Sequence, residues 1–302
     1  ATLREQVAEM QEHYDHMRRW LLAEPRGHAG MSGALLVPTR TADVDYGIIF
    51  MSNAGYGTLS GHGVIAVATA LIETGAVPVD GPGARITFET VAGIVQARAS
   101  IDQGRVRTVR FRNVPAFRLA AGIEIEVDGR AARADVAYGG AWYAIVDATQ
   151  FALQLVPAEV DALRRIGTEV RQAVANALDV VHPLDPALAG LYGTIFVGPA
   201  HSEDATRRTV AVYAGGLIDR SPSGTGISAT MACLAADDEL RVGETFVGES
   251  IVDTLLTGRP VVGQPVGEYP GVVTELAGRG ALTGLHTFVV DPNDPLANTF
   301  VL

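Results

Sequence analysis

The chain of 302 residues contains no lysine, and all 23 of its basic residues are arginine. Lysine forms the aldimine of pyridoxal-phosphate enzymes, the Schiff base of one class of aldolase and the phosphate ligand of the Walker motif, so the sequence excludes these three chemistries. Cysteine occurs once, at Cys233, which excludes an internal disulfide and a thiolate metal cluster. This use of cysteine predicts a cytoplasmic protein.

Long apolar runs and a positive net charge are also missing. The longest apolar run, at residues 64–72, is too short to span a bilayer, and the chain does not begin with a basic segment followed by an apolar one. The net charge is -11 and the arginines are scattered along the sequence, which argues against a nucleic-acid partner. We expect a soluble protein with a small-molecule partner and no membrane partner, and a homodimer stays open.

The residues that are present suggest two cores of ordinary domain size, because the chain is 48% hydrophobic and contains 34 glycines. Spacing and caps predict amphipathic helices over residues 3–23 and 158–178. His13 and His16 lie on the first helix without a third ligand, so we expect no metal site. Strands are predicted at residues 46–51, 86–99, 106–114, 123–127, 194–197, 209–214, 272–276 and 286–290.

A short internal repeat is the most informative pattern. Aligning Ser60 with Ser223 gives a gap-free window of twelve residues in which two glycines, an alanine and a leucine also match. Both copies place a serine and two glycines before an apolar run without proline, which is typical of a serine that caps a helix N-terminus. We therefore expect one buried helix in each half, each with an N-terminus able to bind an anion.

Two common interpretations of such glycines do not fit. A dinucleotide fingerprint needs a strand that runs directly into the turn and an acidic residue about twenty positions later, and both copies lack this context. A nucleophile elbow needs a glycine two positions before the serine, and it is missing before Ser60 and Ser223. The remaining interpretation is an amino acid held by its carboxylate between two helix N-termini, with Asp219 and His62 near its ammonium group and chemistry at Cα.

Seven segments together resemble the proline racemase family, which includes hydroxyproline 2-epimerases and trans-3-hydroxy-L-proline dehydratases. The resemblance covers nearly the whole chain and rests on EPRGHAGMSGALL, SNAGYGTLSGHG, NVPAF, VAYGGAWYAIVDA, DRSPSGTGISA, GETFVGESI and DPNDPLANTFVL. It implies an α+β fold like that of diaminopimelate epimerase, in which two pseudo-symmetric domains each wrap a sheet around a central helix. We expect the first domain at residues 1–117 plus about 285–302, the second at residues 118–284, and the site in the cleft between them.

The resemblance also implies a role for nine residues and a mechanism without cofactor. Two cysteines of the racemases act as acid and base on opposite faces of the substrate, and their positions are Ser60 and Ser223 here. Asp219 and His62 would hold the amine. The backbone amides of the carboxylate cradle would be those of Gly61, His62, Gly224 and Thr225. Tyr213 lies where the family packs an aromatic ring against the substrate, and Ser32 lies where proline-specific members carry a second bulky aromatic.

Serine at both catalytic positions is a departure from the racemases, because a serine hydroxyl is far less acidic than a thiol. Related epimerases and dehydratases carry serine at the first position or threonine at the second, and replacement of natural cysteines by serine is an alternative. A usual N-terminal strand with a His-Thr-Gly-Gly run is also missing: either the numbering begins after a removed segment or one wall of the first domain differs. Three hypotheses follow: an epimerase or racemase of a proline-like amino acid, a hydroxyproline dehydratase, and a non-catalytic amino-acid binder.

Overall fold

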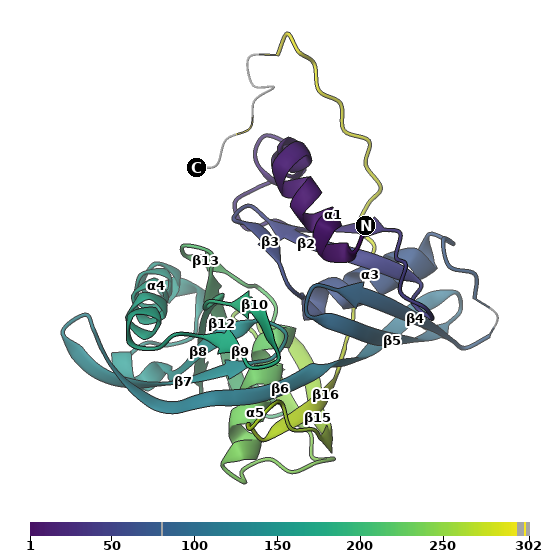
Figure 1. The fold of residues 1–302 in the computed structure, drawn as a ribbon. Coiled ribbons are helices and arrows are strands. Elements are labelled where there is room, and N and C mark those ends of the chain that lie inside the picture. The colour runs from purple at the N-terminus through teal and green to yellow at the C-terminus, as the bar shows by residue number, and fades with distance from the viewer. Residues whose placement is uncertain (80, 295–298, 300–302) are drawn as a thin grey trace.

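The computed structural model describes residues 1–79, 81–294 and 299. Five α-helices are present in these residues, and Figure 1 shows how they lie against a long mixed sheet. A five-residue π-helical segment, Met10–Tyr14, joins the first two helices, and single 3-10 turns lie at Ala148–Phe151 and Pro157–Glu159. The α-helices are α1 (Leu3–Glu9), α2 (Asp15–Leu22), α3 (Gly61–Glu73), α4 (Val160–Ala177) and α5 (Gly224–Ala236).

Most strands belong to one sheet of 14 strands with the order β1-β2-β4-β5-β6-β16-β15-β14-β12-β11-β8-β7, in which β3 pairs with β2 and β13 with β12. β9 and β10 form a separate hairpin. The bounds are β1 Ser32–Val37, β2 Tyr46–Ser52, β3 Gly55–Gly57, β4 Gly83–Thr90, β5 Gly93–Asp102, β6 Arg105–Val127, β7 Arg130–Tyr138, β8 Trp142–Asp147, β9 Val181–His182, β10 Asp185–Ala189, β11 Gly193–Gly198, β12 Arg207–Tyr213, β13 Leu217–Ile218, β14 Phe246–Glu249, β15 Leu255–Gly263 and β16 Gly271–Gly278.

The second half of the molecule is a closed barrel around α5. The last strand of the order, β7, also pairs with β6, so the strands from β6 to β7 form a ring. The sequence of α5 explains its central place, because small and apolar residues cover every side of the helix and its first ten residues are all buried. The barrel therefore presents the N-terminus of α5 at a fixed position.

The first half repeats this plan without closing. Strands β1, β2, β4, β5 and the beginning of β6 form an open sheet, and α3 packs against it with seven buried residues. The helices α1 and α2 lie on the outside of this half (Figure 1). One buried central helix in each half is what the repeat predicted, and the sheet around each of these helices is what the family resemblance implied.

Three sequence predictions differ in detail from the structure. The runs at 106–114 and 123–127 are parts of one strand, β6, which first pairs with β5 and then with β7. The run at 86–99 is a hairpin of two strands, β4 and β5. The strand predicted at 286–290 is wrong: this segment has no neighbouring strand among the described residues, and Val289 is 79% exposed. A strand needs a partner for its backbone N–H and C=O groups, and alternation of apolar residues does not supply one.

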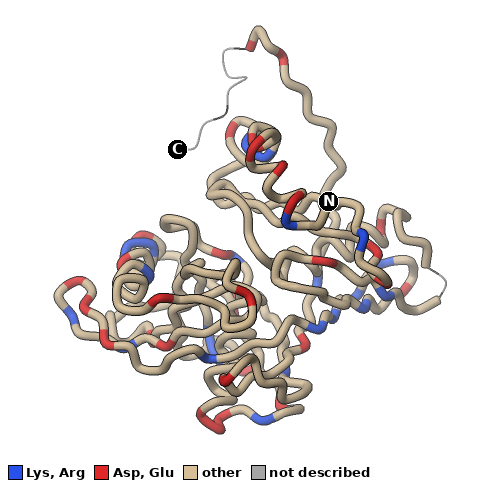
Figure 2. The backbone as a smooth tube through the Cα atoms, viewed as in Figure 1, with Lys and Arg blue, Asp and Glu red and all other residues tan. Residues whose placement is uncertain are grey.

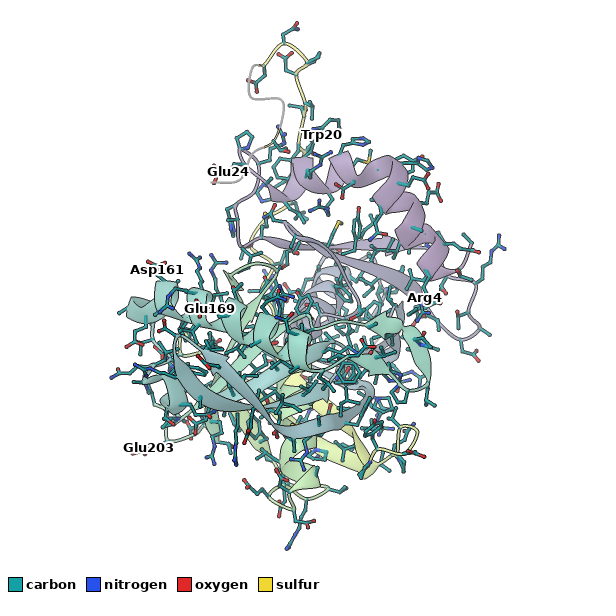
Figure 3. All side chains as sticks on the ribbon, turned by 60° about the vertical axis from the view of Figure 1, so that its left-hand side comes forward. Arg4, Trp20, Glu24, Asp161, Glu169 and Glu203 are labelled. Carbon is teal, nitrogen blue, oxygen red and sulfur yellow. The ribbon has the colours of Figure 1, made fainter. Side chains whose placement is uncertain are left out.

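The proposed domain division stays a prediction. Residue 117 lies inside β6, which runs through both halves without a break. Residues 285–294 extend away from the body of the molecule in Figure 1, and residues 295–298 and 300–302 lie outside the described part of the chain. A polar contact joins the halves at another point, where Arg4 of α1 donates a hydrogen bond of 3.1 Å to Asp185 of β10. Figure 3 shows Arg4 at the lower end of α1.

Charged residues of both signs are spread over both halves, as Figure 2 shows. The arginines are less evenly placed than their spacing in the sequence suggested, because Arg85, Arg98 and Arg110 lie opposite one another across β4, β5 and β6. Among the described residues, the structure contains no helix with the length and apolar character that a membrane crossing requires.

Candidate active site

The two copies of the repeat form two helix N-termini of the same construction. α3 begins at Gly61 and α5 at Gly224, and each helix has 13 residues. Ser60 Oγ accepts a hydrogen bond of 3.2 Å from the amide of Gly63, and Ser223 Oγ accepts one of 3.3 Å from the amide of Gly226. Both serines are therefore N-caps, as the sequence predicted, and the other free amides of each first turn stay available.

The first residues of the two helices are packed against each other. A Cβ atom added to Gly61 would lie 2.8 Å from Gly224 Cα, and one added to Gly224 would lie 2.9 Å from Gly61 Cα. Carbon atoms do not approach this closely without displacement of the backbone, so the contact requires glycine on both sides. This contact brings the positive ends of two helix dipoles together at one place.

One cavity of about 870 Å³ lies above this contact between the two halves. All nine residues that the sequence singled out line its wall, although they come from segments far apart in the chain: Ser32, Ser60, Gly61, His62, Tyr213, Asp219, Ser223, Gly224 and Thr225. The structure thus brings every predicted site residue to one cavity, while the role of each residue stays a prediction.

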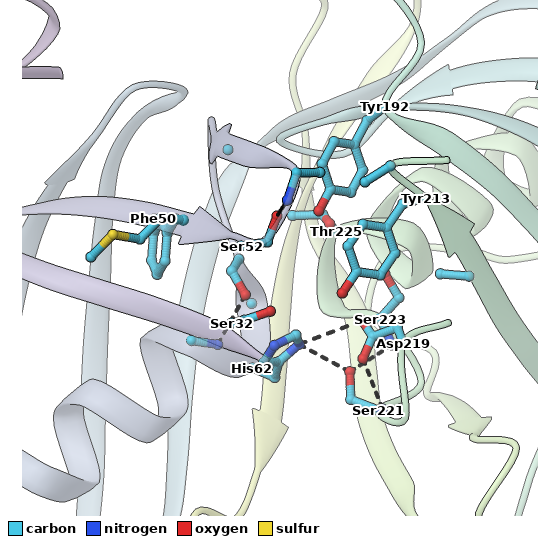
Figure 4. Close-up of a pocket in the computed structure, with 18 of the residues that line it drawn as sticks. Ser32, Phe50, Ser52, His62, Tyr192, Tyr213, Asp219, Ser221, Ser223 and Thr225 are labelled. Atoms are coloured by element: carbon cyan, nitrogen blue, oxygen red, sulfur yellow. Dashed lines mark hydrogen bonds and ion pairs between the residues drawn. The ribbon is translucent and has the colours of Figure 1, made fainter. Parts of the chain in front are cut away.

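A polar contact crosses the cavity between the halves (Figure 4). His62 Nδ1 of α3 lies 3.0 Å from Ser221 Oγ and 3.5 Å from Asp219 Oδ2. The carboxylate also accepts a hydrogen bond of 2.8 Å from the Ser221 amide, and its side chain is only 13% exposed. Ser221 was not predicted as a site residue, although it lies within the quoted DRSPSGTGISA segment.

Three tyrosines form the wall on the side of α5. The rings of Tyr192 and Tyr213 are stacked with centroids 5.3 Å apart, and the ring of Tyr143 meets Tyr192 edge-on at 5.8 Å. Tyr143 Oη lies 2.8 Å from Thr225 Oγ1, and burial is the main cause that raises the pKa of Tyr143. Sequence reasoning missed Tyr143 and Tyr192. Tyr143 lies in the VAYGGAWYAIVDA segment, to which the resemblance assigned no role, and Tyr192 lies outside the seven segments.

The surroundings of Ser60 and Ser223 differ in spite of the repeat. Ser223 is buried, and its backbone has φ of 64°, which is unusual for a residue with a side chain. Its amide donates a hydrogen bond of 3.1 Å to Ser221 Oγ. Ser60 is only half-buried and has extended backbone. Burial and the hydrogen bond to Ser221 hold Ser223 more tightly than Ser60. Backbone strain such as the positive φ of Ser223 is found most often at functional sites.

The site can bind a small anion next to a cation, since helix-start amides form its floor and Asp219 lies at its side. The described residues contain no group of three or more histidine, cysteine, aspartate or glutamate side chains that could hold a metal ion. What the cavity wall offers to a ligand is thus backbone amides, hydroxyls, the carboxylate of Asp219, the imidazoles of His28 and His62, two arginine side chains and tyrosine rings.

The model of the family described as proline racemase matches residues 1–301 of the chain. The chain belongs to the proline racemase family. A protein of Bacillus thuringiensis named trans-3-hydroxy-L-proline dehydratase is 41% identical over 99% of the chain and 89% of its own length. A proline racemase of Clostridioides difficile is 37% identical over 97% and 88%, and a 4-hydroxyproline 2-epimerase of Streptosporangium roseum is 37% identical over 98% and 90%.

Solved structures agree with this membership of the proline racemase family. A hydroxyproline epimerase of Agrobacterium vitis, with bound trans-4-hydroxy-L-proline, has a TM-score of 0.93 at 31% identity and covers 100% of the chain and 87% of its own. A probable proline racemase of Agrobacterium radiobacter, with bound carbonate, has a TM-score of 0.92 at 34% identity and covers 100% and 89%. A phenazine biosynthesis protein of the PhzF family shares the fold alone, at a TM-score of 0.54 and 18% identity. The expected α+β fold is confirmed.

Proposed function

We propose that the protein removes the α-proton of proline, a hydroxyproline or a related cyclic amino acid and returns a proton to the opposite face of Cα. The observation that carries this proposal is the contact of Gly61 with Gly224, which joins two serine-capped helix starts beneath one cavity. A pair of matched acid-base groups on two sides of one atom is what inversion at Cα needs.

The carboxylate of the substrate lies at the joined helix starts in this proposal. The amides of Gly61, His62, Gly224 and Thr225 are unpaired within their helices and point outward from the first turn. Hydrogen bonds from such amides to a carboxylate are charge-assisted, and two helix dipoles add to the attraction. As negative charge moves from Cα onto the carboxylate during proton removal, the same groups stabilise the developing anion more strongly than the substrate.

The ammonium group lies at the other side of the site, beside Asp219. This carboxylate is only 13% exposed and lies 3.5 Å from His62 Nδ1, so it offers a negative charge at the cavity wall. The ring of the substrate then meets Tyr213, which is buried and stacked on Tyr192. Ser32 contributes a polar group where proline-specific relatives carry a bulky aromatic, which leaves room for a hydroxyl substituent.

Dehydration of a 3-hydroxyproline is the second candidate, and one observation favours it. The hydroxyl groups are not distributed evenly: the Ser223 amide donates to Ser221 Oγ and the paired hydroxyls of Tyr143 and Thr225 line the same cavity, whereas Ser60 Oγ has no hydroxyl as a hydrogen-bond partner among the described residues. Elimination needs one base and one proton donor for the leaving hydroxyl rather than two equal groups. Two of the most similar relatives are named as dehydratases of this substrate, at 41% and 40% identity.

One experiment separates these functions from simple binding. The protein is incubated in deuterium oxide with L- and D-proline, the 4-hydroxyprolines and trans-3-hydroxy-L-proline, and the products are followed by proton NMR. Inversion with deuterium at Cα supports the epimerase, and loss of the 3-hydroxyl with formation of a pyrroline supports the dehydratase. Neither product, together with a thermal shift by the planar analogue pyrrole-2-carboxylate, contradicts both reactions and supports a binder.

Matched variants assign the chemistry to the site. Ser60→Ala and Ser223→Ala are each expected to reduce exchange at Cα at least about a hundredfold, the usual contribution of a positioned acid or base. Ser100→Ala removes an exposed serine of β5 that does not line the cavity and is expected to keep the wild-type rate. Equal rates in all three variants would show that the exchange takes place elsewhere.

The proposed reaction uses no cofactor, and this part has its own test. Without lysine the chain cannot form an aldimine with pyridoxal phosphate, and the proposed transfers use one serine as the alkoxide that accepts the α-proton and the other as the hydroxyl that donates a proton to Cα. We expect the exchange rate to be unchanged after dialysis against EDTA and in the presence of hydroxylamine. Loss of activity with either reagent, and recovery after addition of a metal or of pyridoxal phosphate, would contradict the mechanism.

A further inference from the structure

The turn between β7 and β8 lies between the two helix starts, in a segment to which the family resemblance assigned no role. A Cβ atom added to Gly139 of this turn would lie 2.2 Å from the carbonyl oxygen of Thr225 in α5. Gly140 has φ of 105°, and a Cβ atom added to it would lie 2.6 Å from Leu59 Cδ2 and 3.1 Å from Thr225 Cγ2. Leu59 directly precedes Ser60, so the turn contacts both serine-capped helix starts.

Thr58 connects this turn to the open sheet of the first half. Its hydroxyl donates a hydrogen bond of 2.6 Å to the carbonyl oxygen of Gly140. The direction of this bond is fixed, because a carbonyl oxygen can only accept. The carbonyl oxygen of Thr58 itself accepts a hydrogen bond of 3.3 Å from the amide of Ala92, in the turn between β4 and β5. Thr58 is thus bonded to both halves of the molecule.

Asn113 of β6 attaches the same turn to α5. Its Nδ2 atom donates hydrogen bonds of 2.8 Å to the carbonyl oxygen of Gly139 and to Ser228 Oγ of α5. The side chain is only 4% exposed, and a buried hydrogen bond is electrostatically stronger than one in water. The turn is therefore fixed to α5, and the bond from Thr58 attaches the segment before α3 to it.

We propose that Thr58 is a positioning residue, which fixes the orientation of Ser60 relative to Ser223 through its hydrogen bond to Gly140. This proposal rests on the proposed proton transfer at Cα. Transfer at two faces of one atom needs both hydroxyls within hydrogen-bond reach of the substrate at the same time. A misplacement of about 1 Å can cost about a hundredfold in rate, so a restraint on the two helix starts bears directly on the reaction.

A second attachment is needed because one contact leaves the helix starts free to turn. Gly61 packs against Gly224 at one point, which sets how closely α3 and α5 approach each other but not the angle between them. The bond from Thr58 to Gly140 lies beside this point, since Gly140 packs on the residue before Ser60. Together the two attachments restrict the angle.

Contacts that cross between the halves elsewhere restrain the helix starts less. His62 and Ser221 meet at 3.0 Å, but both residues line the cavity that a ligand enters. The side chains of Arg4 and Asp185 are 46% and 31% exposed, so solvent screens their attraction. Thr58 is not among the described residues that line the cavity, so its bond is available with and without a ligand.

Spin labels test this inference without any substrate. Nitroxides are attached through Ser100→Cys in β5 and Asp161→Cys in α4, which are exposed positions in different halves, and double electron–electron resonance measures the distance between them. The native Cys233 is buried, which protects it from the label. We expect Thr58→Val to broaden the distribution of distances, and Thr58→Ser, which keeps the hydroxyl, to retain the narrow distribution of the parent protein.

Thr90→Val is the matched control. Thr90 Oγ1 donates a hydrogen bond of 2.7 Å to the carbonyl oxygen of Gly93, so this substitution removes a bond of the same kind inside the first half. We expect it to keep the narrow distribution. An unchanged distribution in Thr58→Val, or equal broadening in both variants, would overturn the inference. Thr58→Ala removes the same hydroxyl and takes the place of Thr58→Val if that variant folds in low yield.

The rate of α-proton exchange separates positioning from stability. We expect Thr58→Val to lower kcat by at least about tenfold per folded molecule, because the two hydroxyls no longer keep one orientation. Thr58→Ser and Thr90→Val are expected to stay near the wild-type kcat. A normal kcat in Thr58→Val, or an equal loss in Thr90→Val, would contradict a positioning role. Wild-type protein without exchange on any substrate would contradict the proposed function, while the spin-label distances still decide the role of Thr58.

Discussion

Serine hydroxyls at positions 60 and 223 lie in surroundings that favour their ionised forms only in part. A helix N-terminus and one amide hydrogen bond stabilise negative charge on each oxygen. A serine hydroxyl nevertheless starts from a pKa far above that of a thiol, whose reference value is near 8.5. In the proposed reaction we therefore expect proton transfer by serine to be limited by acidity rather than by placement.

Replacing both serines by cysteine tests whether acidity limits the reaction. We expect Ser60→Cys combined with Ser223→Cys to raise α-proton exchange on proline or a hydroxyproline by at least about tenfold, because the acid and base then have a pKa near the working pH. Proton NMR in deuterium oxide measures the rate. Ser100→Cys introduces a thiol at an exposed position of β5 and is expected to leave the rate unchanged. A double variant that binds pyrrole-2-carboxylate and exchanges no proton would show that the cavity serves another chemistry.

The N-termini of α3 and α5 lie together because Gly61 packs against Gly224, and a substitution in α3 tests this contact between the two helices. We expect Gly61→Ala to destabilise the protein by about 1–3 kcal/mol, the usual cost of overpacking, since its Cβ would lie 2.8 Å from Gly224 Cα. The separated helix starts should also bind pyrrole-2-carboxylate more weakly, which isothermal titration calorimetry measures. Gly263→Ala adds a Cβ with no atom within 4 Å and is expected to change neither quantity.

Much of this arrangement was predictable from the sequence, and the rest was not for physical reasons. Ser60 and Ser223 were predicted as caps because a serine before a glycine and an apolar run is a local signal. The closure of the barrel depends on β6 pairing with both β7 and β16, which are far from each other in the chain, and no local pattern reports such pairing. Tyr143 was missed for the same reason, because its hydroxyl reaches Thr225 only after β8 joins the barrel.

A buried ion pair holds one wall of the barrel. Arg208 of β12 and Glu249 of β14 lie directly opposite each other in register, both are 1% exposed, and their side chains are 3.1 Å apart. The amides of His201 and Ser202 also donate to Glu249. Arg208 also lies 2.7 Å from Asp253, so it keeps one acidic partner when Glu249 is neutralised, whereas loss of Arg208 leaves Glu249 without an arginine partner among the described residues.

We expect Glu249→Gln to lower the free energy of unfolding by about 3 kcal/mol, the lower end of the usual range for removal of one partner of a buried pair, because Asp253 still pairs with Arg208. Urea denaturation followed by circular dichroism measures the change. Glu275→Gln is the matched control, because Glu275 pairs with Arg259 on the exposed face of the neighbouring strands. A surface pair contributes at most about 1 kcal/mol, so equal effects of the two substitutions would contradict this account of the wall.

At the scale of the whole molecule, the two halves meet where β6 passes from the open sheet into the barrel. Aromatic rings from several segments gather there, and His182 of the small hairpin packs among them. The centroid of its ring lies 4.9 Å from that of Tyr138 and 5.3 Å from that of Phe117. This packing joins the hairpin to the junction, so we expect protonation of His182 to weaken the packing between the two halves.

Burial lowers the pKa of His182, which has a defined consequence for the pH dependence of stability. The unfolded chain takes up the proton near pH 6.5, before the folded protein does, so stability is full above that pH and falls as the pH drops toward the folded pKa. The half-exposed ring is screened by solvent, so the slope stays below the one-proton limit of about 1.4 kcal/mol per pH unit. The pKa of some acidic groups, such as Asp15, is lowered in the folded protein, and their protonation reduces stability only near pH 4 and below.

We therefore expect the thermal unfolding midpoint to fall between pH 7 and pH 5, and His182→Gln to remove a measurable part of that decrease. Scanning calorimetry at constant ionic strength provides the comparison. His13→Gln is the control, since the side chain of His13 is 60% exposed and lies outside the junction. If His182→Gln keeps the full pH dependence while His13→Gln reduces it, the acid sensitivity does not come from the junction between the halves.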